Sequence, residues 1–170
     1  MQIREAHTND AEIVSQLART TFDETFGHLF NDRQILLDYF ERTFSQEKIR
    51  DSIQKENNVF WLVFIAGKPV AYAKLKLNSR SEFVHANKVS QLQKIYVLKE
   101  FLFMKIGLKL QSALLQRAVD YGSEQIWLSV FIENKRAINF YLKNDFTEVG
   151  AHQFQIGKYS FDFIAMRKVL

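Results

Sequence analysis

Tyr141 is the side chain whose type and surroundings in the sequence best suit proton transfer. It lies in residues 126–146, where a short apolar run stops at Asn134 and is followed by apolar residues at helical intervals. This pattern predicts a strand, a helix capped by the Asn134 side chain, and a stop at residues 144–145. Asn134, Ala137 and Tyr141 then project from one helix face, beside a strand end where ligands bind. An amphipathic helix with an ordinary half-buried tyrosine explains the pattern equally well.

The same segment resembles the signature of the GNAT N-acetyltransferases, a strand followed by Asn-x-x-Ala-x-x-Phe-Tyr-x-x-x-x-Phe. The matching residues are Asn134, Ala137, Phe140, Tyr141 and Phe146. The resemblance implies that the cofactor is acetyl-CoA, that Asn134 and Ala137 face it, and that Tyr141 is the catalytic residue that protonates the departing sulfur. A thiol has a pKa of about 8.5 and a phenol one of about 10, so we expect Tyr141 to be protonated at neutral pH.

Residues 99–107 lie between a predicted strand and a predicted helix, where free backbone N–H groups could meet a pyrophosphate. GNAT proteins typically carry Gln/Arg-x-x-Gly-x-Gly/Ala here, and aligning on Gly107 puts Leu102 at the polar position and Lys105 at the first glycine. A non-glycine residue costs about 1 kcal/mol if the turn needs a positive φ, although Lys105 also brings a cation to the phosphates. We therefore expect weakened or rearranged cofactor binding.

The same loop contains four consecutive apolar residues, 101–104. They could form an apolar lid or a contact between subunits, but we expect two of them to pack under the sheet.

The mechanism that the resemblance implies is direct attack of an amine on the thioester in a ternary complex, with a backbone N–H near Val97 stabilising the oxyanion. It needs no metal. The implied cofactor-binding residues are Ile95, Tyr96, Val97, Phe103, Met104, Lys105, Ile106, Gly107, Leu108, Lys109, Asn134, Ala137, Tyr141 and Lys143.

The base that deprotonates the amine stays open. Many relatives place a glutamate on the fourth strand for this purpose, but the matching position here is Gln93, which cannot accept the proton. A water chain, Glu133, His152 and bulk solvent are the alternatives.

A closer resemblance, to the PaiA polyamine acetyltransferases, spans the chain. It rests on Thr21-Phe22-x-x-Thr25-Phe26, Tyr39-Phe40-x-x-x-Phe44, Ile126-Trp127-Leu128 and Gly150-Ala151-His152-x-Phe154. It implies a spermidine- or spermine-like substrate. The implied substrate residues are Phe22, Asp23, Thr25, Phe26 and Tyr39. The carboxylates of Asp23, Glu24 and Asp38 could draw such a polycation, although each could equally belong to a solvated helix face.

Helical and strand-like patterns alternate along the whole chain. The first third predicts a strand at 2–6, a helix capped at 8–10 and running to about 26, and a helical segment after 32 that breaks near 45 and reaches 53. Strands follow at 59–66 and 70–77 around a turn at 67–69, then a loop at 78–87 and a strand at 89–97. The rest predicts a helix from 107 closed at 122, a strand at 126–131, the helix after Asn134, and strands at 147–154 and 159–168.

This order matches the GNAT acyl-CoA N-acyltransferase fold, an α/β (α+β) class. The match implies a mixed central sheet of about seven strands with about four helices, splayed between strands four and five. The length of 170 residues suits a single N-acetyltransferase domain over residues 1–170.

Composition narrows the partners. The chain has no cysteine, and its four histidines lack metal-ligand spacing, so we expect no metal. The N-terminus lacks a signal-peptide pattern and no apolar run exceeds strand length, so we expect a cytoplasmic protein without membrane contact. Residues 1–60 hold seven Lys/Arg and eleven Asp/Glu (−4), and residues 61–170 hold sixteen and eight (+8). The basic part suits a phosphate-bearing ligand, and the acidic part a cation.

We therefore predict an acetyl-CoA-dependent N-acetyltransferase for a primary amine of a small polycation, either a monomer or a homodimer. A non-catalytic acyl-CoA-binding or regulatory protein is the alternative, favoured by Leu102, Lys105 and Gln93, and an acetyltransferase for another small amine or a protein amine is a further one. Nucleic-acid binding is disfavoured because the basic residues show no helix-turn-helix or aromatic-interleaved pattern.

Overall fold

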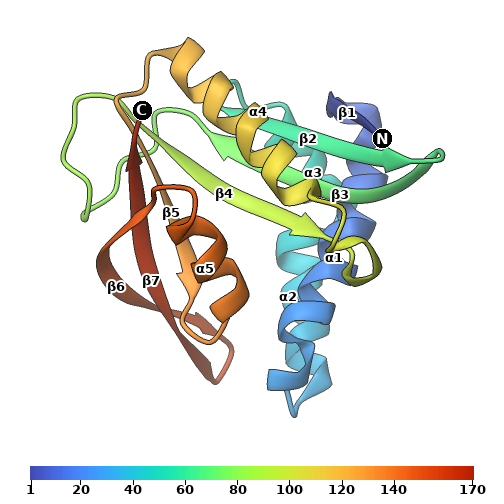
Figure 1. Ribbon diagram of the computed structural model, residues 1–170. Coiled ribbons are helices and arrows are strands. Elements are labelled where there is room, and N and C mark those ends of the chain that lie inside the picture. Colours follow the sequence, from blue (N-terminus) through green and yellow to red (C-terminus); the bar gives the residue numbers. More distant parts are fainter. The chain divides into compact units, whose positions relative to one another are not determined.

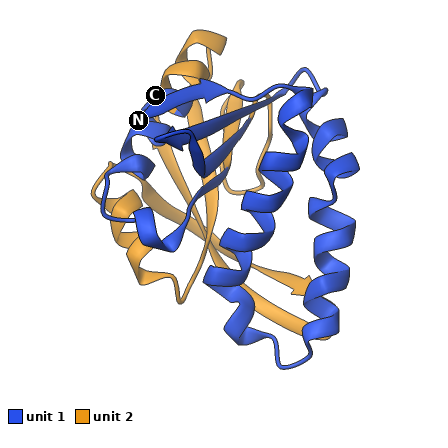
Figure 2. Ribbon diagram, turned by 90° about the vertical axis from the view of Figure 1, so that its right-hand side faces the viewer, with its two compact units in different colours: residues 1–75, 94–114 blue, residues 76–93, 115–170 orange.

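Strand β4, Val89–Val97, is the long strand that the sequence predicts, and it lies in the middle of a seven-stranded sheet. In this computed structural model the strand order is β1-β2-β3-β4-β5-β7-β6 (Figure 1). The structure describes residues 1–170. They form two compact units, unit 1 with residues 1–75 and 94–114, and unit 2 with residues 76–93 and 115–170 (Figure 2).

Unit 1 begins with β1, Gln2–Glu5, which pairs antiparallel with β2, Asn58–Ile65. The helices between them are α1 (Ala11–Phe26), α2 (Arg33–Phe44) and α3 (Gln46–Ile53), with 3-10 turns at Thr8–Asp10 and Gly27–Leu29. Helices α1 and α2 lie side by side within this unit (Figure 1). The side chain of Ser45 accepts the N–H of Lys48 and caps α3, which confirms the break predicted near residue 45. The fold consequently has five α-helices.

The turn between β2 and β3 lies one residue earlier than the sequence suggested. Strand β3 is Lys68–Lys76, so Pro69 belongs to the strand and the turn predicted at 67–69 is wrong. The turn residues are Ala66 and Gly67, with φ of 48° and 78°. Two consecutive positive φ angles define a two-residue turn whose twist matches a hairpin. Proline is tolerated at the start of a strand, where its missing N–H removes little pairing.

Helix α4, Ile106–Tyr121, begins one residue before Gly107 and ends as predicted at Gly122. Gly122 has a φ of 84°. Its N–H donates to Val119 O at 2.8 Å, and the N–H of Ser123 donates to Ala118 O at 2.9 Å. These two bonds form a Schellman motif, which explains why a glycine ends the helix here. A further 3-10 turn, Lys99–Phe101, precedes α4.

Unit 2 contains the other half of the sheet. Strand β5, Gln125–Phe131, pairs antiparallel with β7, Tyr159–Val169, which pairs antiparallel with β6, Thr147–Ile156. Helix α5, Lys135–Leu142, follows β5. Strand β5 also pairs in parallel with β4, but only over Val89↔Gln125, Ser90↔Ile126 and Gln91↔Trp127. The ladder thus ends before either strand does, and this is the splayed pair that the resemblance implied.

Gly150 marks an irregularity in β6, where the register shifts between Glu148 and Gly150. A Cβ atom at Gly150 would lie 2.2 Å from the ring of Phe83. Glycine is therefore required there by the close approach of an aromatic ring to the backbone. None of the helices combines the length and apolar composition that a membrane span requires.

Candidate active site

The predicted site residues fall into two sets, one in each unit. In unit 2 the cap of α5 forms as expected, because Asn134 Oδ1 accepts the N–H of Ala137 at 3.1 Å. Tyr141 is on the same helix and only 9% exposed. Its ring contacts Phe140 and Phe146, with centroid distances of 5.3 and 5.4 Å. Burial raises the pKa of Tyr141 above that of a free phenol, so its hydroxyl stays protonated well into alkaline solution.

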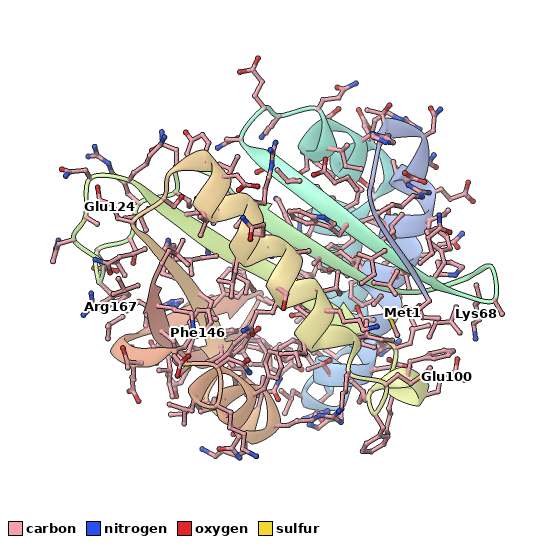
Figure 3. All side chains as sticks on the ribbon, turned by 45° about the horizontal axis from the view of Figure 1, so that its top comes forward. Met1, Lys68, Glu100, Glu124, Phe146 and Arg167 are labelled. Atoms are coloured by element: carbon pink, nitrogen blue, oxygen red, sulfur yellow. The ribbon has the colours of Figure 1, made fainter.

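The end of α5 is held from several sides. Asp145 has a φ of 64°, and the N–H of Phe146 donates to Tyr141 O at 3.1 Å. Lys168 Nζ donates to Asn144 O at 2.8 Å and lies 3.1 Å from Asp145 Oδ2. Phe146 points into unit 2 and is 1% exposed (Figure 3). These contacts fix the helix turn that carries Tyr141.

His152 and Glu133, two candidates for the base, differ in their surroundings. His152 Nε2 lies 2.7 Å from Ser129 Oγ, and its ring stacks between Phe83 and Phe163, at centroid distances of 6.1 and 5.7 Å. Glu133 is exposed, as is Lys143. The imidazole is therefore held in the sheet by a hydrogen bond and two rings.

In unit 1, the loop before α4 shows whether the residue at the first glycine position of the motif, Lys105, needs a positive φ. Lys105 has a φ of 57°, so the residue at the first glycine position of the motif does adopt a left-handed conformation. Its carbonyl oxygen accepts the N–H of Lys109 at 3.3 Å. The N–H groups of Ile106, Gly107 and Leu108 precede this first helical bond and have no acceptor within α4.

The apolar run of the loop divides into two halves. Phe101 and Leu102 are half-buried, with Lys68 Nζ 5.3 Å from the centroid of the Phe101 ring. Lys68 also pairs with Glu100 at 2.7 Å, at one edge of unit 1 (Figure 3). Phe103 and Met104, in contrast, are 89% and 45% exposed. Two of the four residues are thus half-buried and two are exposed to solvent, and packing of the first two under the sheet stays a prediction.

Most of the predicted substrate residues belong to an aromatic cluster on α1 and α2. Phe22 is at its centre, with ring centroids 4.7 Å from Phe26, 5.1 Å from Tyr39, 5.9 Å from Phe40 and 5.8 Å from Phe44. Burial raises the pKa of Tyr39. We call these five residues the acceptor cluster, after the substrate role that the sequence predicts for Phe22, Phe26 and Tyr39; the four phenylalanines are buried. Thr25 is less available, because its hydroxyl donates to Thr21 O at 2.8 Å.

The carboxylates near this cluster already have partners. Arg33 donates to both oxygens of Asp23, at 2.6 and 2.5 Å, and lowers the pKa of that carboxyl. Glu24 accepts the backbone N–H of Lys99 at 3.0 Å, and Asp38 accepts from the Gln34 amide at 2.8 Å. Asp23 and Glu24 nevertheless line an open hollow of about 430 Å³, together with Arg19, Thr20 and Phe40.

A charged residue that the sequence patterns do not single out lies against the acceptor cluster. Lys94 of β4 is half-buried, and its Nζ lies 5.7 Å from the ring centroid of Phe44 and 5.8 Å from that of Tyr96. Burial lowers its pKa to about 8. The alternation of β4 could have revealed it, because Lys94 shares a strand face with Leu92 and Tyr96. Ile95, Tyr96 and Val97, the predicted cofactor residues on the strand, are half-buried.

A family model, a sequence relative and solved structures all point to N-acetyltransferases. The model of the acetyltransferase (GNAT) family matches residues 29–146. A sequence relative, an uncharacterized N-acetyltransferase in the pepI 3' region of Lactobacillus delbrueckii subsp. lactis, is 26% identical over 142 residues, which are 83% of this chain and 81% of the relative.

Two solved structures illustrate the similarity of fold. The PaiA N-acetyltransferase from Thermoplasma acidophilum in complex with coenzyme A has a TM-score of 0.78 and 22% identity, covering 99% of this chain and 98% of that one. The ribosomal-protein-S18-alanine N-acetyltransferase from Escherichia coli has a TM-score of 0.71 and 19% identity, covering 99% of this chain and 92% of that one.

Proposed function

Because the chain belongs to the acetyltransferase (GNAT) family, we propose that it transfers the acetyl group of acetyl-CoA to a primary amine of a small polycation such as spermidine or spermine. Acetyl-CoA-dependent N-acetyl transfer is the activity of the family. The observation that carries the polycation as acceptor is the hollow lined by two carboxylates, Asp23 and Glu24, beside the aromatic ring of Phe40. The sequence resemblance to the PaiA polyamine acetyltransferases supports the same acceptor class.

The loop and first turn of α4 are a suitable donor set for the pyrophosphate of coenzyme A. Three backbone N–H groups, of Ile106, Gly107 and Leu108, have no acceptor in the helix, and the helix dipole favours negative charge at this end. Lys105 and Lys109 would add two cations. The acetyl-CoA supplies an activated thioester, and these groups would hold its phosphates and orient it.

Tyr141 would donate the proton that the departing sulfur needs. A thiol in water has a pKa of about 8.5, below that of a phenol, so donation to a fully solvated thiolate is uphill. A thiolate released in apolar surroundings also has its pKa raised, because burial penalises the charged form of both groups. Burial of Tyr141 therefore keeps the donor protonated but also makes it a weaker acid, and the raised pKa of a thiolate released in the same apolar surroundings offsets this.

The experiment that tests this function is thiol release from acetyl-CoA with and without spermidine, with calorimetric binding of CoA on the same samples. We expect spermidine-dependent release in the wild type and a loss of about 10²-fold or more in kcat for Tyr141→Phe, with CoA binding retained. Tyr121→Phe is the matched control, because Tyr121 is a half-buried tyrosine at the end of α4 whose ring meets Lys88.

Two other outcomes would change the assignment. Binding of CoA without release for a broad panel of amines would favour a non-catalytic acyl-CoA-binding protein, which the left-handed Lys105 and the glutamine at position 93 motivate. Release with monoamines or a peptide N-terminus, but not with spermidine, would favour another small amine or a protein amine. The pairing of Asp23 with Arg33 is the observation behind that alternative.

A further inference from the structure

Lys94 is a charged side chain in unit 1 that has no counter-ion. The ion pairs of the structure are Arg4–Asp10, Arg19–Glu41, Arg33–Asp23, Lys68–Glu100 and Lys168–Asp145, and Lys94 is in none of them. Its ammonium group instead faces the rings of Phe44 and Tyr96. The ring faces offset the desolvation of this half-buried charge only in part.

The ionisable groups on the elements around Lys94 do not supply an anion. Tyr96 on β4 stacks on Tyr72 of β3 at 5.8 Å, and burial raises the pKa of Tyr72 well above its ordinary value. Tyr39 of α2, whose pKa is also raised, contacts Phe44 at 5.6 Å. The phenols of Tyr72 and Tyr39 are therefore neutral near pH 7. Lys74, also on β3, lies over the ring of Phe60, 5.2 Å from its centroid.

The carboxylates on the neighbouring helices are engaged elsewhere. On α2, Glu41 pairs with Arg19 at 2.8 Å and Asp38 accepts from an amide. On α1, Asp23 pairs with Arg33 and Glu24 accepts a backbone N–H. No anion in unit 1 therefore stabilises the charged form of Lys94, and its pKa of about 8 leaves a minor neutral fraction at pH 7 that grows to about half near pH 8.

We propose that the Nζ amine of Lys94 accepts the proton that the acceptor amine loses when its nitrogen attacks acetyl-CoA. The proposal rests on the proposed function. Lys94 lies three residues before Val97 on the same strand, about 10 Å along it, and its Nζ lies 5.8 Å from the ring centroid of Tyr96, the residue next to Val97. Its Nζ meets Phe44, a member of the acceptor cluster. Lys94 is therefore on the strand that we expect to lie beside the thioester, and its side chain contacts the residues proposed to hold the amine.

Lys94 would thus take the role that Gln93 cannot fill. The acceptor nitrogen forms a bond to the acetyl carbon, the carbon–sulfur bond breaks, and the sulfur takes the proton of Tyr141. The proton released from the nitrogen goes to Lys94 Nζ. Exchange with solvent then returns a proton to Tyr141 and removes one from Lys94. A neighbouring ammonium would also lower the pKa of the bound amine, because two like charges in one site cannot both be held easily.

The test is the pH dependence of kcat/KM for Lys94→Met and Lys94→Arg, with spermidine as the probe. In the wild type we expect activity to rise with pH through a limb near the pKa of Lys94, about 8. Both variants should lose about 10²-fold or more at pH 7.5, and their activity should recover only as pH approaches the pKa of the free amine, about 10. Arginine is the decisive variant, because it keeps the charge but cannot deprotonate.

Lys74→Met is the matched control, since Lys74 is another half-buried lysine that faces a ring from the adjacent strand. It should keep the wild-type pH profile. CoA binding by calorimetry should be unchanged in all variants. Nitrogen-15 NMR of the lysine side chains, assigned with Lys94→Arg, should give a titration of Lys94 Nζ near 8 independently of activity.

The outcomes distinguish the role of Lys94 from the proposed function. Activity of Lys94→Arg that equals the wild type would overturn the role of Lys94 and leave the proposed function intact, as would a Lys94 titration above 10. A wild type that binds CoA but acetylates no amine would overturn the proposed function, and the role of Lys94 with it. Lys94→Gln provides a smaller polar replacement if the methionine variant does not fold.

Discussion

Lys94 illustrates how a single residue can oppose stability in this chain. Below pH 8 the ammonium is charged in both the folded and the unfolded protein, but only the folded protein desolvates it. The folded-state pKa is depressed below the unfolded value of 10.5, so the unfolded chain binds more protons between these values. Stability therefore rises as pH increases from about 8 to 10.5.

Replacing Lys94 with methionine should remove this penalty. We expect Lys94→Met to raise the free energy of unfolding at pH 7 by roughly 1–3 kcal/mol, and this gain should shrink as pH rises from about 8 to 10.5. Urea unfolding at several pH values measures it, with Lys74→Met as the control. A gain that is independent of pH would show that packing, and not desolvation, is responsible. A residue that lowers stability without a structural partner is a candidate for function.

Individual site residues differed in how far the sequence could predict them. The Asn134 cap follows from local chemistry, because it depends only on near neighbours, whereas a left-handed backbone at Lys105 was raised only by the family motif that carries glycine at this position. The ion pair between Asp23 and Arg33 does not, since it joins residues ten positions apart across a turn between two helices. Lys94 was missed for a related reason, because the anions available to it depend on tertiary packing.

In the loop before α4, residues 99–105, a single residue combines an unusual backbone conformation with a proposed role in binding CoA. Lys105 holds a left-handed φ of 57°, and glycine adopts this conformation without the steric cost of a Cβ atom. We expect Lys105→Gly to raise the free energy of unfolding by about 1 kcal/mol. The same change removes a cation, so the Kd for CoA should rise several-fold and depend less steeply on salt.

The hairpin turn of β2 and β3 supplies the control for Lys105→Gly. Ala66 also has a left-handed φ, of 48°, but it carries no charge and lies outside the loop. Ala66→Gly should therefore stabilise the chain to a similar degree without changing the affinity for CoA. Chemical unfolding and calorimetry separate the two effects. If Ala66→Gly weakened CoA binding as much as Lys105→Gly does, the proposed contact of Lys105 with the phosphates would be wrong.

Elements were easier to predict than their junctions. Hydrophobic periodicity and capping residues located all seven strands and the helices, since each pattern is local and repeats over many residues. The turn at Ala66 was misplaced because glycine and proline punctuate sequences strongly, whereas alanine is rarely left-handed. The parallel pairing of β4 and β5 follows from the helix that connects them, but the shortness of their ladder could not be read from either strand and was expected only from the resemblance of the whole order of elements.

At the scale of the whole molecule, the uneven distribution of charge is the feature that bears on the acceptor. Residues 1–60 carry a balance of −4 and residues 61–170 a balance of +8. Pairing of Asp23 with Arg33 neutralises a local charge but leaves the long-range field of the acidic segment in place. A polycation should be drawn by this field, whereas a monoamine of similar length should feel it less.

Ionic strength therefore provides a test of the acceptor class. Raising salt from about 20 to 200 mM shortens the Debye length to below about 10 Å and screens such attraction. We expect KM for spermidine to rise several-fold over this range and KM for butylamine to change little, with kcat unaffected for both. Asp38→Asn, which removes a carboxylate that has no ion pair, should weaken the salt dependence for spermidine. Equal salt dependence for the two amines would mean that the aromatic rings of the acceptor cluster, and not the acidic segment, select the substrate, and would favour a smaller, less charged acceptor.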